Sequence, residues 1–184
     1  MLAGFDAVID FTTPQAVISN MRACFANGAR VVVGTTGWYD KLNEMCAICE
    51  RRNAALLYGE NFSDGIQVMY QLARNLLPLV HGYKIVVSET HHEGKKDAPS
   101  GTAIAIRQTL LDVDPSLEVE IVSQRKGEAV GTHTITASLG DDVVKIEHEA
   151  LSRRSFAAGA VRAAEWLCGK TGCYNFSDIY PKLR

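Results

Sequence analysis

Short apolar runs alternate with longer amphipathic segments over the first third of the chain. The runs at Ala7–Phe11, Arg30–Val33 and Ala54–Tyr58 favour strands, because they are brief and bounded by turn residues. Helices are expected between them, from Thr13 to Gly28 and over Tyr39–Arg52. Strands joined through helices pair in parallel. The pattern therefore predicts an α/β fold with a partial, Rossmann-like parallel sheet.

Small and hydroxyl residues follow these strands. In a doubly wound sheet the turns after the strands share one edge, which is where ligands bind. Glycine and hydroxyl side chains there can admit a flat cofactor ring, although the same residues also form ordinary tight turns. The turn residues concerned are Thr12, Gly34, Thr35, Thr36, Glu60, Asn61, Phe62 and Ser63.

Beyond Ser63 the order of elements changes. A long helix should begin at Ser63 and end near Pro78, because proline disrupts a helix interior. A strand at Lys84–Thr90 and a helix at Thr102–Leu111 follow. Three more strand-like stretches and a closing helix complete the pattern, at Leu117–Gln124, His133–Leu139, Val143–Glu149 and Phe156–Cys168.

These patterns divide the chain into two expected domains. A mixed sheet with one or two helices fits residues 64–151, which indicates a second, α+β domain. Residues 1–63 and 152–184 would form the first domain, because the Ala- and Gly-rich start of the closing helix permits close packing.

The segment Glu89–Ala103 concentrates groups that can exchange protons. It holds two adjacent imidazoles, His91 and His92, and an ammonium group at Lys95. Neighbouring residues of a regular strand point to opposite faces, so at most one of the two histidines would face a given pocket. The break at Gly94 would let the loop gather both. A lone histidine or lysine in a loop is usually solvated, but this clustering indicates a functional site.

The same segment contains a helix start suited to anions. Asp97 or Ser100 can cap the helix that begins near Gly101. The free N–H groups and the positive dipole end of such a helix attract a carboxylate or a phosphate. Gly101 lets the anion approach the backbone without a Cβ in the way. Proton donors beside an anion site predict chemistry on a small acidic substrate.

Composition excludes several other classes of function. The 184 residues are 47% hydrophobic with a net charge of −2, as expected of an ordinary globular protein. No basic patch points to nucleic acid, and the short loop 125–128 would be solvated or would close over an acidic ligand. The longest apolar runs fall far short of the roughly 20 residues that span a bilayer. The first residues lack a signal-peptide pattern, so we expect a cytoplasmic protein without a membrane partner.

The cysteines and histidines do not suggest a metal or redox centre. Cys46 and Cys49 form a C-x-x-C pattern, but it lies inside an expected helix and lacks a second pair. Buried, reduced thiols are the expectation there. No recognisable ligand spacing connects the histidines, so no metal site is expected at His91, His92, His133 or His148.

Residues 89–103 resemble the signature of the dihydrodipicolinate reductase family. The family pattern is Glu-x-His-His-x-x-Lys-x-Asp-Ala-Pro-Ser-Gly-Thr-Ala, and each fixed position is present. Further blocks agree in order along nearly the whole chain, at Ile9–Thr12 with Pro14, Gly34–Gly37, Asn61–Ser63, Ser152–Arg153 and Phe156–Val161.

The resemblance implies a nicotinamide-dependent reductase that acts on a cyclic dicarboxylate in lysine and diaminopimelate biosynthesis. By position, His91 would be the catalytic proton donor and acceptor, and Lys95 the second donor. His92, Gly101 and Thr102 would bind the substrate. NADH or NADPH would contact Thr12, Gly34, Thr35, Thr36, Gly59, Glu60, Asn61, Phe62, Arg153 and Phe156. Members of the family usually form tetramers through the second domain's sheet, so a homotetramer is expected.

The chain departs from the family pattern at its front. The family opens with a strand, a glycine-rich phosphate turn and a helix, whereas no G-x-G-x-x-G occurs here before Gly34. The first domain is therefore expected to be an incomplete dinucleotide-binding domain. Cofactor binding is the function that this departure puts in question.

Three alternatives to a reductase stay open on the sequence. A truncated, non-catalytic relative would keep the dicarboxylate site and lose the cofactor. The 184 residues could instead be part of a longer protein. A lyase that forms a Schiff base through Lys95 would belong to another enzyme class.

Overall fold

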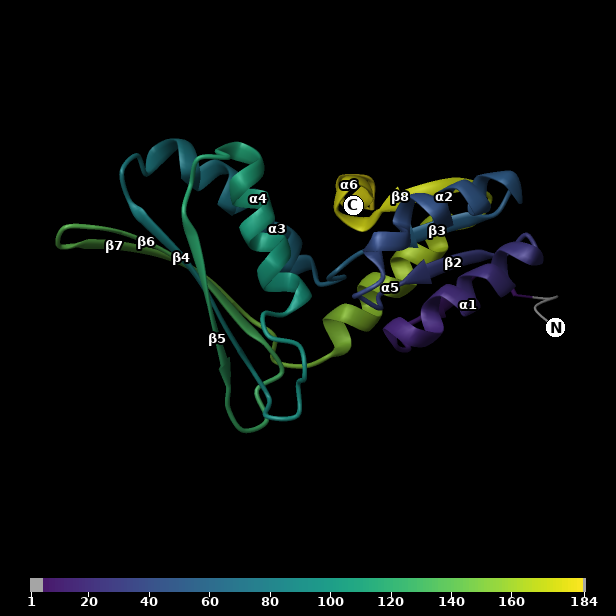
Figure 1. The fold of residues 1–184 in the computed structure, drawn as a ribbon, viewed down its shortest axis with the longest axis horizontal. Helices are drawn as coiled ribbons and strands as arrows, with labels where there is room; N and C mark the ends of the chain where they lie inside the picture. Colours follow the sequence, from purple (N-terminus) through teal and green to yellow (C-terminus); the bar gives the residue numbers. More distant parts are fainter. Residues whose placement is uncertain (1–4, 184) are drawn as a thin grey trace. The chain divides into compact units, whose positions relative to one another are not determined.

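The computed structural model describes residues 5–183, which form two compact units. One unit joins the chain up to Ser63 to the residues from Phe156 onward, and the other spans Asp64–Ser155. Each unit has its own sheet, one parallel and one mixed (Figure 1). The expected α/β class, with a Rossmann-like parallel sheet and a mixed sheet, is confirmed.

Four parallel strands form the sheet of the first unit, in the order β1-β2-β3-β8. They are β1 (Val8–Asp10), β2 (Arg30–Val33), β3 (Ala55–Tyr58) and β8 (Gly172–Asn175). The first three lie where the apolar runs predicted strands. The sequence did not predict β8, because four half-buried residues carry no periodic signal.

Helices cover both faces of the parallel sheet. α1 (Pro14–Ala26) and α2 (Leu42–Arg51) pack on one face, and α5 (Arg154–Leu167) packs on the other. Alternate residues of β2 divide between the two cores, so Val31 joins the α1 and α2 side and Val32 the α5 side. The shorter helical elements of this unit are η1 (Tyr39–Lys41), α6 (Phe176–Ile179) and η3 (Tyr180–Lys182).

α5 approaches the turn after β3 at a glycine. A Cβ added at Gly159 would lie 1.9 Å from the carbonyl oxygen of Phe62, so a larger residue cannot fit without a shift of the backbone. The Phe62 ring also packs on Phe176, with 4.5 Å between the ring centroids. The close packing expected of the closing helix is confirmed, and it fixes the turn that precedes Ser63.

The expectation of reduced thiols in the C-x-x-C pattern is wrong for one of its cysteines. Cys46 on α2 forms a disulfide with Cys173 on β8, 127 residues further along the chain. Cys49 is a free, buried thiol, and burial raises its pKa to about 11. The pairing depends on the packing of α2 beside β8, and the sequence carried no signal for that strand.

The second unit contains a mixed sheet in the order β5-β4-β6-β7. Its strands are β4 (Lys84–His91), β5 (Val119–Arg125), β6 (Thr132–Leu139) and β7 (Asp142–Glu149). β4 pairs in parallel with β5 and antiparallel with β6, and β6 and β7 form an antiparallel hairpin.

Two helices cover one face of the mixed sheet, α3 (Asp64–Leu76) and α4 (Gly101–Val113). α3 gives way to η2 (Leu77–Leu79), which contains Pro78, so this helix ends where proline predicted. Within residues 5–183, no helix is both long and apolar enough to cross a membrane.

Candidate active site

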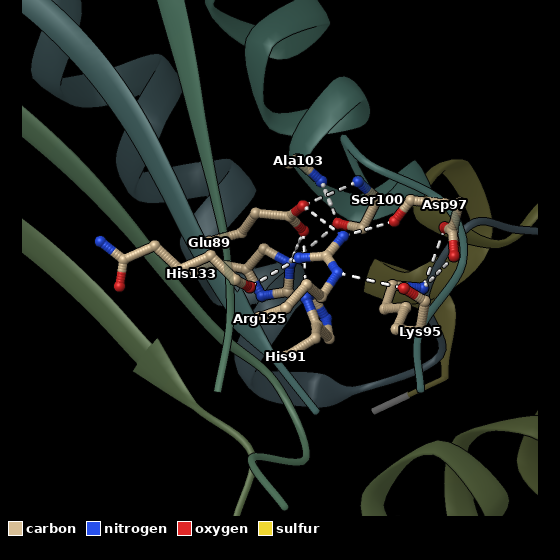
Figure 2. A network of polar contacts seen from close by, with 9 residues as sticks. Glu89, His91, Lys95, Asp97, Ser100, Ala103, Arg125 and His133 are labelled. Carbon is tan, nitrogen blue, oxygen red and sulfur yellow. Dashed lines mark hydrogen bonds and ion pairs between the residues drawn. The ribbon is translucent and has the colours of Figure 1, made fainter. Parts of the chain in front are cut away.

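Strand β4 brings two ionisable residues onto the face that α3 and α4 cover. The preceding inward residues of β4 lie in the apolar core, and strand alternation places Glu89 and His91 on the same side. Both are buried, with 1% and 7% of their surface exposed. Across the sheet, Glu89 pairs in register with His133 on β6, and His91 with Arg125 on β5. Four polar side chains from three adjacent strands therefore meet in one cluster (Figure 2).

Donors from two directions hold the Glu89 carboxylate. Its Oε1 accepts the backbone N–H of Ser100 at 3.0 Å and pairs with Nη2 of Arg125 at 3.2 Å. Its Oε2 lies 3.1 Å from Nδ1 of His91. Burial disfavours the charged form, but hydrogen bonds from Ser100, Ser123 and Arg125 outweigh burial and lower the pKa of Glu89 to about 2. A negative charge is thus fixed beside His91 at neutral pH.

Two buried imidazoles pack together in this cluster. The rings of His91 and His133 meet edge to face with 5.1 Å between their centroids. Burial lowers the pKa of His91 and outweighs the opposing effect of the Glu89 charge. Burial lowers the pKa of His133 to about 3, so this imidazole is neutral at pH 7. His91 is therefore the imidazole of the pair that is better able to carry a proton near neutral pH.

Lys95 lies in the loop after β4, where a carboxylate holds it. Its Nζ is 2.8 and 2.9 Å from the two carboxylate oxygens of Asp97. Arg125 binds the same loop, because its Nε donates to the Lys95 carbonyl at 3.2 Å and its Nη2 donates to the Asp97 carbonyl. The guanidinium thus connects the loop to Glu89. Arg125 ends β5 and is not simply solvated, so the expectation for the loop 125–128 is wrong at that residue.

Of the two adjacent histidines, only His91 joins the cluster of Figure 2. His92 follows the last residue of β4 and is half-buried. A Cβ added at Gly94 would lie 3.3 Å from Nδ1 of His92, so the turn folds back closely on this ring. The expectation that the loop gathers both histidines stays a prediction.

The start of α4 lies beside the same cluster. Oγ of Ser100 accepts the N–H of Ala103 at 3.2 Å, which makes Ser100 the cap, while Asp97 pairs with Lys95. Gly101 and Thr102 begin the helix, and their backbone N–H groups belong to its first turn. Ser100 therefore links the two features: it caps the 13-residue helix α4, and its backbone N–H binds Glu89.

Three side chains of the cluster could also hold a metal ion. Ligand atoms of Glu89, His91 and His133 all lie within 4.8 Å of one another. Two imidazoles and a carboxylate form a recurrent zinc ligand set. However, Glu89 already pairs with Arg125 at 3.2 Å, and that guanidinium would repel a divalent cation. The expected absence of a metal stays a prediction.

In the parallel unit, Asp10 organises the turns at the carboxyl ends of β1 and β2. Its Oδ1 accepts the N–H of Thr12 at 2.9 Å, the Thr12 hydroxyl at 2.7 Å and the Thr35 hydroxyl at 3.2 Å. Its Oδ2 accepts the side-chain amide of Asn20 at 2.8 Å. Burial opposes the ionisation of Asp10, but these bonds outweigh it and lower its pKa. Two of the predicted cofactor residues, Thr12 and Thr35, are therefore held by one carboxylate.

The glycines of these turns are closely packed. A Cβ added at Gly34 would lie 2.2 Å from the Phe11 ring, and one at Gly59 would lie 2.8 Å from Cβ of Phe176. Burial raises the pKa of neighbouring Glu60. These positions lie at the ends of adjacent parallel strands, as the sequence predicted.

The other predicted cofactor residues lie in three further segments of the chain. Oδ1 of Asn61 accepts the N–H of Ser63 at 2.8 Å, which tightens the turn that contains Phe62. Thr36 is half-buried after β2. Arg153 is exposed just before α5, and Phe156 is half-buried in the first turn of that helix. The roles of these residues stay predictions.

Sequence reasoning missed several residues of both clusters. Glu89 carried a usable signal, because it lies two residues after the inward Val87 and a carboxylate at an inward strand position needs a partner. Arg125 and His133 carried none, because strand pairing alone brings them to Glu89. Gly131 was also missed: a Cβ there would lie 3.0 Å from Nε2 of His91.

These features define a class of protein: an α/β protein with a Rossmann-like parallel unit and a mixed-sheet unit that carries a buried acid–imidazole cluster. The chain belongs to the dihydrodipicolinate reductase family. Residues 1–62 match the family model for the N-terminus of dihydrodipicolinate reductase, and residues 65–180 match the model for its C-terminus. The resemblance drawn from the signature segment is therefore confirmed.

Several relatives are enzymes named 4-hydroxy-tetrahydrodipicolinate reductase. That of Christiangramia forsetii is 38% identical over 97% of this chain and 80% of its own length. That of Natronomonas pharaonis is 38% identical over 97% of this chain and 79% of its own length. Among solved structures, a dipicolinate-bound dihydrodipicolinate reductase from Paenisporosarcina sp. TG-14 has the same fold, with a TM-score of 0.72. The two sequences are 24% identical, and the match covers 95% of this chain and 73% of the Paenisporosarcina chain.

Proposed function

We propose that the protein catalyses the NADH- or NADPH-dependent reduction of a cyclic dicarboxylate to tetrahydrodipicolinate, a step of lysine and diaminopimelate biosynthesis. The names of its relatives and its family membership support this proposal. The observation that carries it is the position of His91, a buried imidazole beside Lys95 and the capped start of α4. Proton donors next to an anion-binding helix start suit a ring with two carboxylates.

Each residue of the candidate site has a defined role in this proposal. Gly101 and Thr102, at the start of α4, hold one substrate carboxylate, and His92 contributes to the binding of the ring. His91 donates the proton that neutralises the charge developing on the ring. Lys95, kept in place by Asp97, assists as the second donor. General acid catalysis of this kind contributes about 10²- to 10⁴-fold to the rate.

The residues of the parallel unit fit the ring end of a nicotinamide cofactor. Thr12, Gly34, Thr35 and Gly59 lie in turns at the ends of neighbouring strands, and Asp10 fixes the two threonine hydroxyls there. Glu60, Asn61, Phe62, Thr36 and Phe156 complete the proposed cofactor contacts of this unit, and Arg153, which precedes it in the chain, is proposed as a further contact. A bound nicotinamide supplies the hydride for the reduction. Thr12, Thr35 and the neighbouring turn residues would hold the cofactor.

The mixed sheet also supports the proposed assembly into a homotetramer. α3 and α4 cover one face, whereas the opposite face exposes apolar side chains such as Val122 and Val143, which are 36% and 56% exposed. Apolar groups on an uncovered sheet face are candidates for contact with another subunit. A cytoplasmic location is proposed with the same biosynthetic role.

Turnover with NADH and with NADPH tests the function directly. Loss of reduced-nicotinamide absorbance would be followed with 4-hydroxy-tetrahydrodipicolinate as substrate, and dipicolinate binding would be measured by calorimetry. His91→Gln should lower kcat by about 10²-fold or more with little change in KM. His81→Gln, at an exposed histidine of the same unit, is the matched control.

The outcomes separate the candidate functions. Turnover by the wild type that depends on His91 supports the reductase. Binding of dipicolinate without turnover or cofactor binding would instead support the non-catalytic relative. Full activity of His91→Gln would contradict the role proposed for that residue.

A further inference from the structure

Glu89 is a buried carboxylate to which the proposed function gives no role. It lies on β4 two residues before His91, and its side chain is fully covered. Ionising a carboxylate there is costly unless partners compensate, and Ser100 and Arg125 supply that compensation at Oε1. The carboxylate is therefore fixed in charge and in position, with Oε2 still directed at an imidazole.

Oε2 of Glu89 and Nδ1 of His91 are positioned to form a hydrogen bond with each other. They lie 3.1 Å apart, and both are buried atoms without a hydrogen-bond partner elsewhere among residues 5–183. Buried polar atoms are almost always paired, so a small rotation of the ring that aligns these two satisfies both. The competing imidazole, His133, is further away, with Nε2 at 3.9 Å from Oε2 and at 3.3 Å from Oγ of Ser100.

We propose that Glu89 is the positioning residue that keeps a proton on Nδ1 of His91, so that Nε2 is the atom that exchanges a proton with the substrate. The proposal rests on the function proposed above for His91. An ionised carboxylate only accepts hydrogen bonds, so the nitrogen that faces it must carry the hydrogen. This selects one tautomer and one orientation of the ring, as a carboxylate does for a catalytic histidine in other enzymes.

The proton balance follows from this arrangement. Addition of hydride to the unsaturated ring leaves an electron pair on the ring, and that pair takes the proton from Nε2 of His91. The N–H bond at Nε2 breaks, and the imidazole is left neutral with its hydrogen on Nδ1. Water returns a proton to Nε2 before the next turnover. Glu89 keeps its charge throughout and stabilises the imidazolium before transfer.

Charged or titratable groups on the strands and the loop around His91 face this imidazole. They are Glu89 on β4, Lys95 and Asp97 in the loop after it, Arg125 on β5 and His133 on β6. The two cations lower the pKa of His91, and the Glu89 charge raises it. Loss of that charge should therefore lower the pKa of His91 further. The branch of the kcat profile that falls as His91 loses its proton would then move to lower pH.

Nitrogen-15 NMR of labelled wild-type protein tests the tautomer without an activity assay. Above the pKa of His91, its Nδ1 should show the shift of a protonated ring nitrogen and Nε2 that of an unprotonated one. Glu89→Gln replaces an oxygen by an amide, which can donate to Nδ1, so the tautomer should reverse. The opposite tautomer in the wild type would overturn the inference, whether or not any variant folds.

Kinetics of Glu89→Gln give the second readout. We expect kcat to fall about 100-fold, KM to change less than threefold and the pH profile to move toward acid. Glu89→Asp keeps the negative charge but moves it away from His91. The kcat of this variant should therefore lie between those of the wild type and Glu89→Gln. Glu120→Gln, an exposed carboxylate on β5, is the control and should match the wild type.

The two proposals fail in different ways. If His91→Gln lowers kcat and Glu89→Gln, folded by circular dichroism, leaves kcat and its pH profile unchanged, the role of Glu89 is wrong and that of His91 stands. If His91→Gln has no effect, the proposed function itself is wrong at this residue.

Discussion

The Thr35 hydroxyl at the end of β2 donates a hydrogen bond of 3.2 Å to Oδ1 of Asp10 at the end of β1. A side-chain bond thereby joins two turns that lie beside each other at the carboxyl edge of the parallel sheet. The same oxygen accepts both the N–H and the hydroxyl of Thr12. Asp10 is therefore the common acceptor of two residues predicted to contact the cofactor.

Asp10→Asn should weaken this junction. An asparagine has only one acceptor oxygen, and its amide would face the amide donor of Asn20. We expect a loss of about 1–3 kcal/mol in the free energy of unfolding, which a denaturant titration would measure. Affinity for NADH or NADPH should fall, while affinity for dipicolinate should not. Asp6→Asn, at an exposed carboxylate near β1, is the control, and an equal loss in both variants would contradict the prediction.

Gly159→Ala should be strongly destabilising, whereas Gly34→Ala should not. The added methyl group at Gly159 meets the backbone oxygen of Phe62 at 1.9 Å, so a helix or a turn must move. At Gly34 it meets the exposed ring of Phe11, which can rotate away. Overpacking of the first kind costs about 1–3 kcal/mol or more. Thermal unfolding of both variants gives the comparison, and equal melting temperatures would contradict it.

Lys95→Met should lower kcat without abolishing it, because His91, the proposed principal donor, would remain. We expect a loss of about 10- to 100-fold, at or below the lower limit of the usual contribution of general acid catalysis. Both oxygens of Asp97 hold Nζ of Lys95, so an attack of this nitrogen on a carbonyl would have to break the ion pair. Borohydride should therefore trap no covalent adduct with the substrate. A trapped adduct seen by mass spectrometry would favour the Schiff-base lyase.

Glu89 should make the protein sensitive to acid. Its folded-state pKa of about 2 lies below the ordinary value of 4.5, so the folded state binds fewer protons than the unfolded state between these limits. The stability that Glu89 contributes is therefore complete above about pH 4.5 and is lost as the pH falls toward about 2. The difference in unfolding free energy between wild type and Glu89→Gln should shrink over that window. A difference that stays constant from pH 6 to pH 3 would contradict this assignment.

Local sequence patterns were sufficient for the elements with strong periodicity. The three strands before Ser63, the end of α3 near Pro78 and a cap for α4 at Asp97 or Ser100 all follow from residue types within a few positions, and the structure selects Ser100. The signature segment also located His91 and Lys95, which lie in one cluster because they are close in sequence.

Long-range pairing was beyond the reach of the same patterns. Arg125 reaches Glu89 only because β5 pairs with β4, and the Cys46–Cys173 bond requires a strand too short to predict. Asp10 looked like an ordinary end of a strand until the fold brought Thr35 beside it. The sequence patterns thus missed the two carboxylates that organise the clusters, Glu89 and Asp10. They did identify most of the residues that these carboxylates bind.

The route of the chain through its two units has a consequence for biosynthesis. The mixed-sheet unit is one continuous stretch, Asp64–Ser155, so all of its strands leave the ribosome together and can pair at once. The parallel sheet cannot be completed at that stage, because β8, which pairs with β3, is synthesised more than a hundred residues after it. Until then, the β3 edge is an unpaired row of backbone donors and acceptors. During synthesis, the unit with the proposed proton donors can therefore mature first, and the unit with the proposed cofactor turns is the one exposed to aggregation.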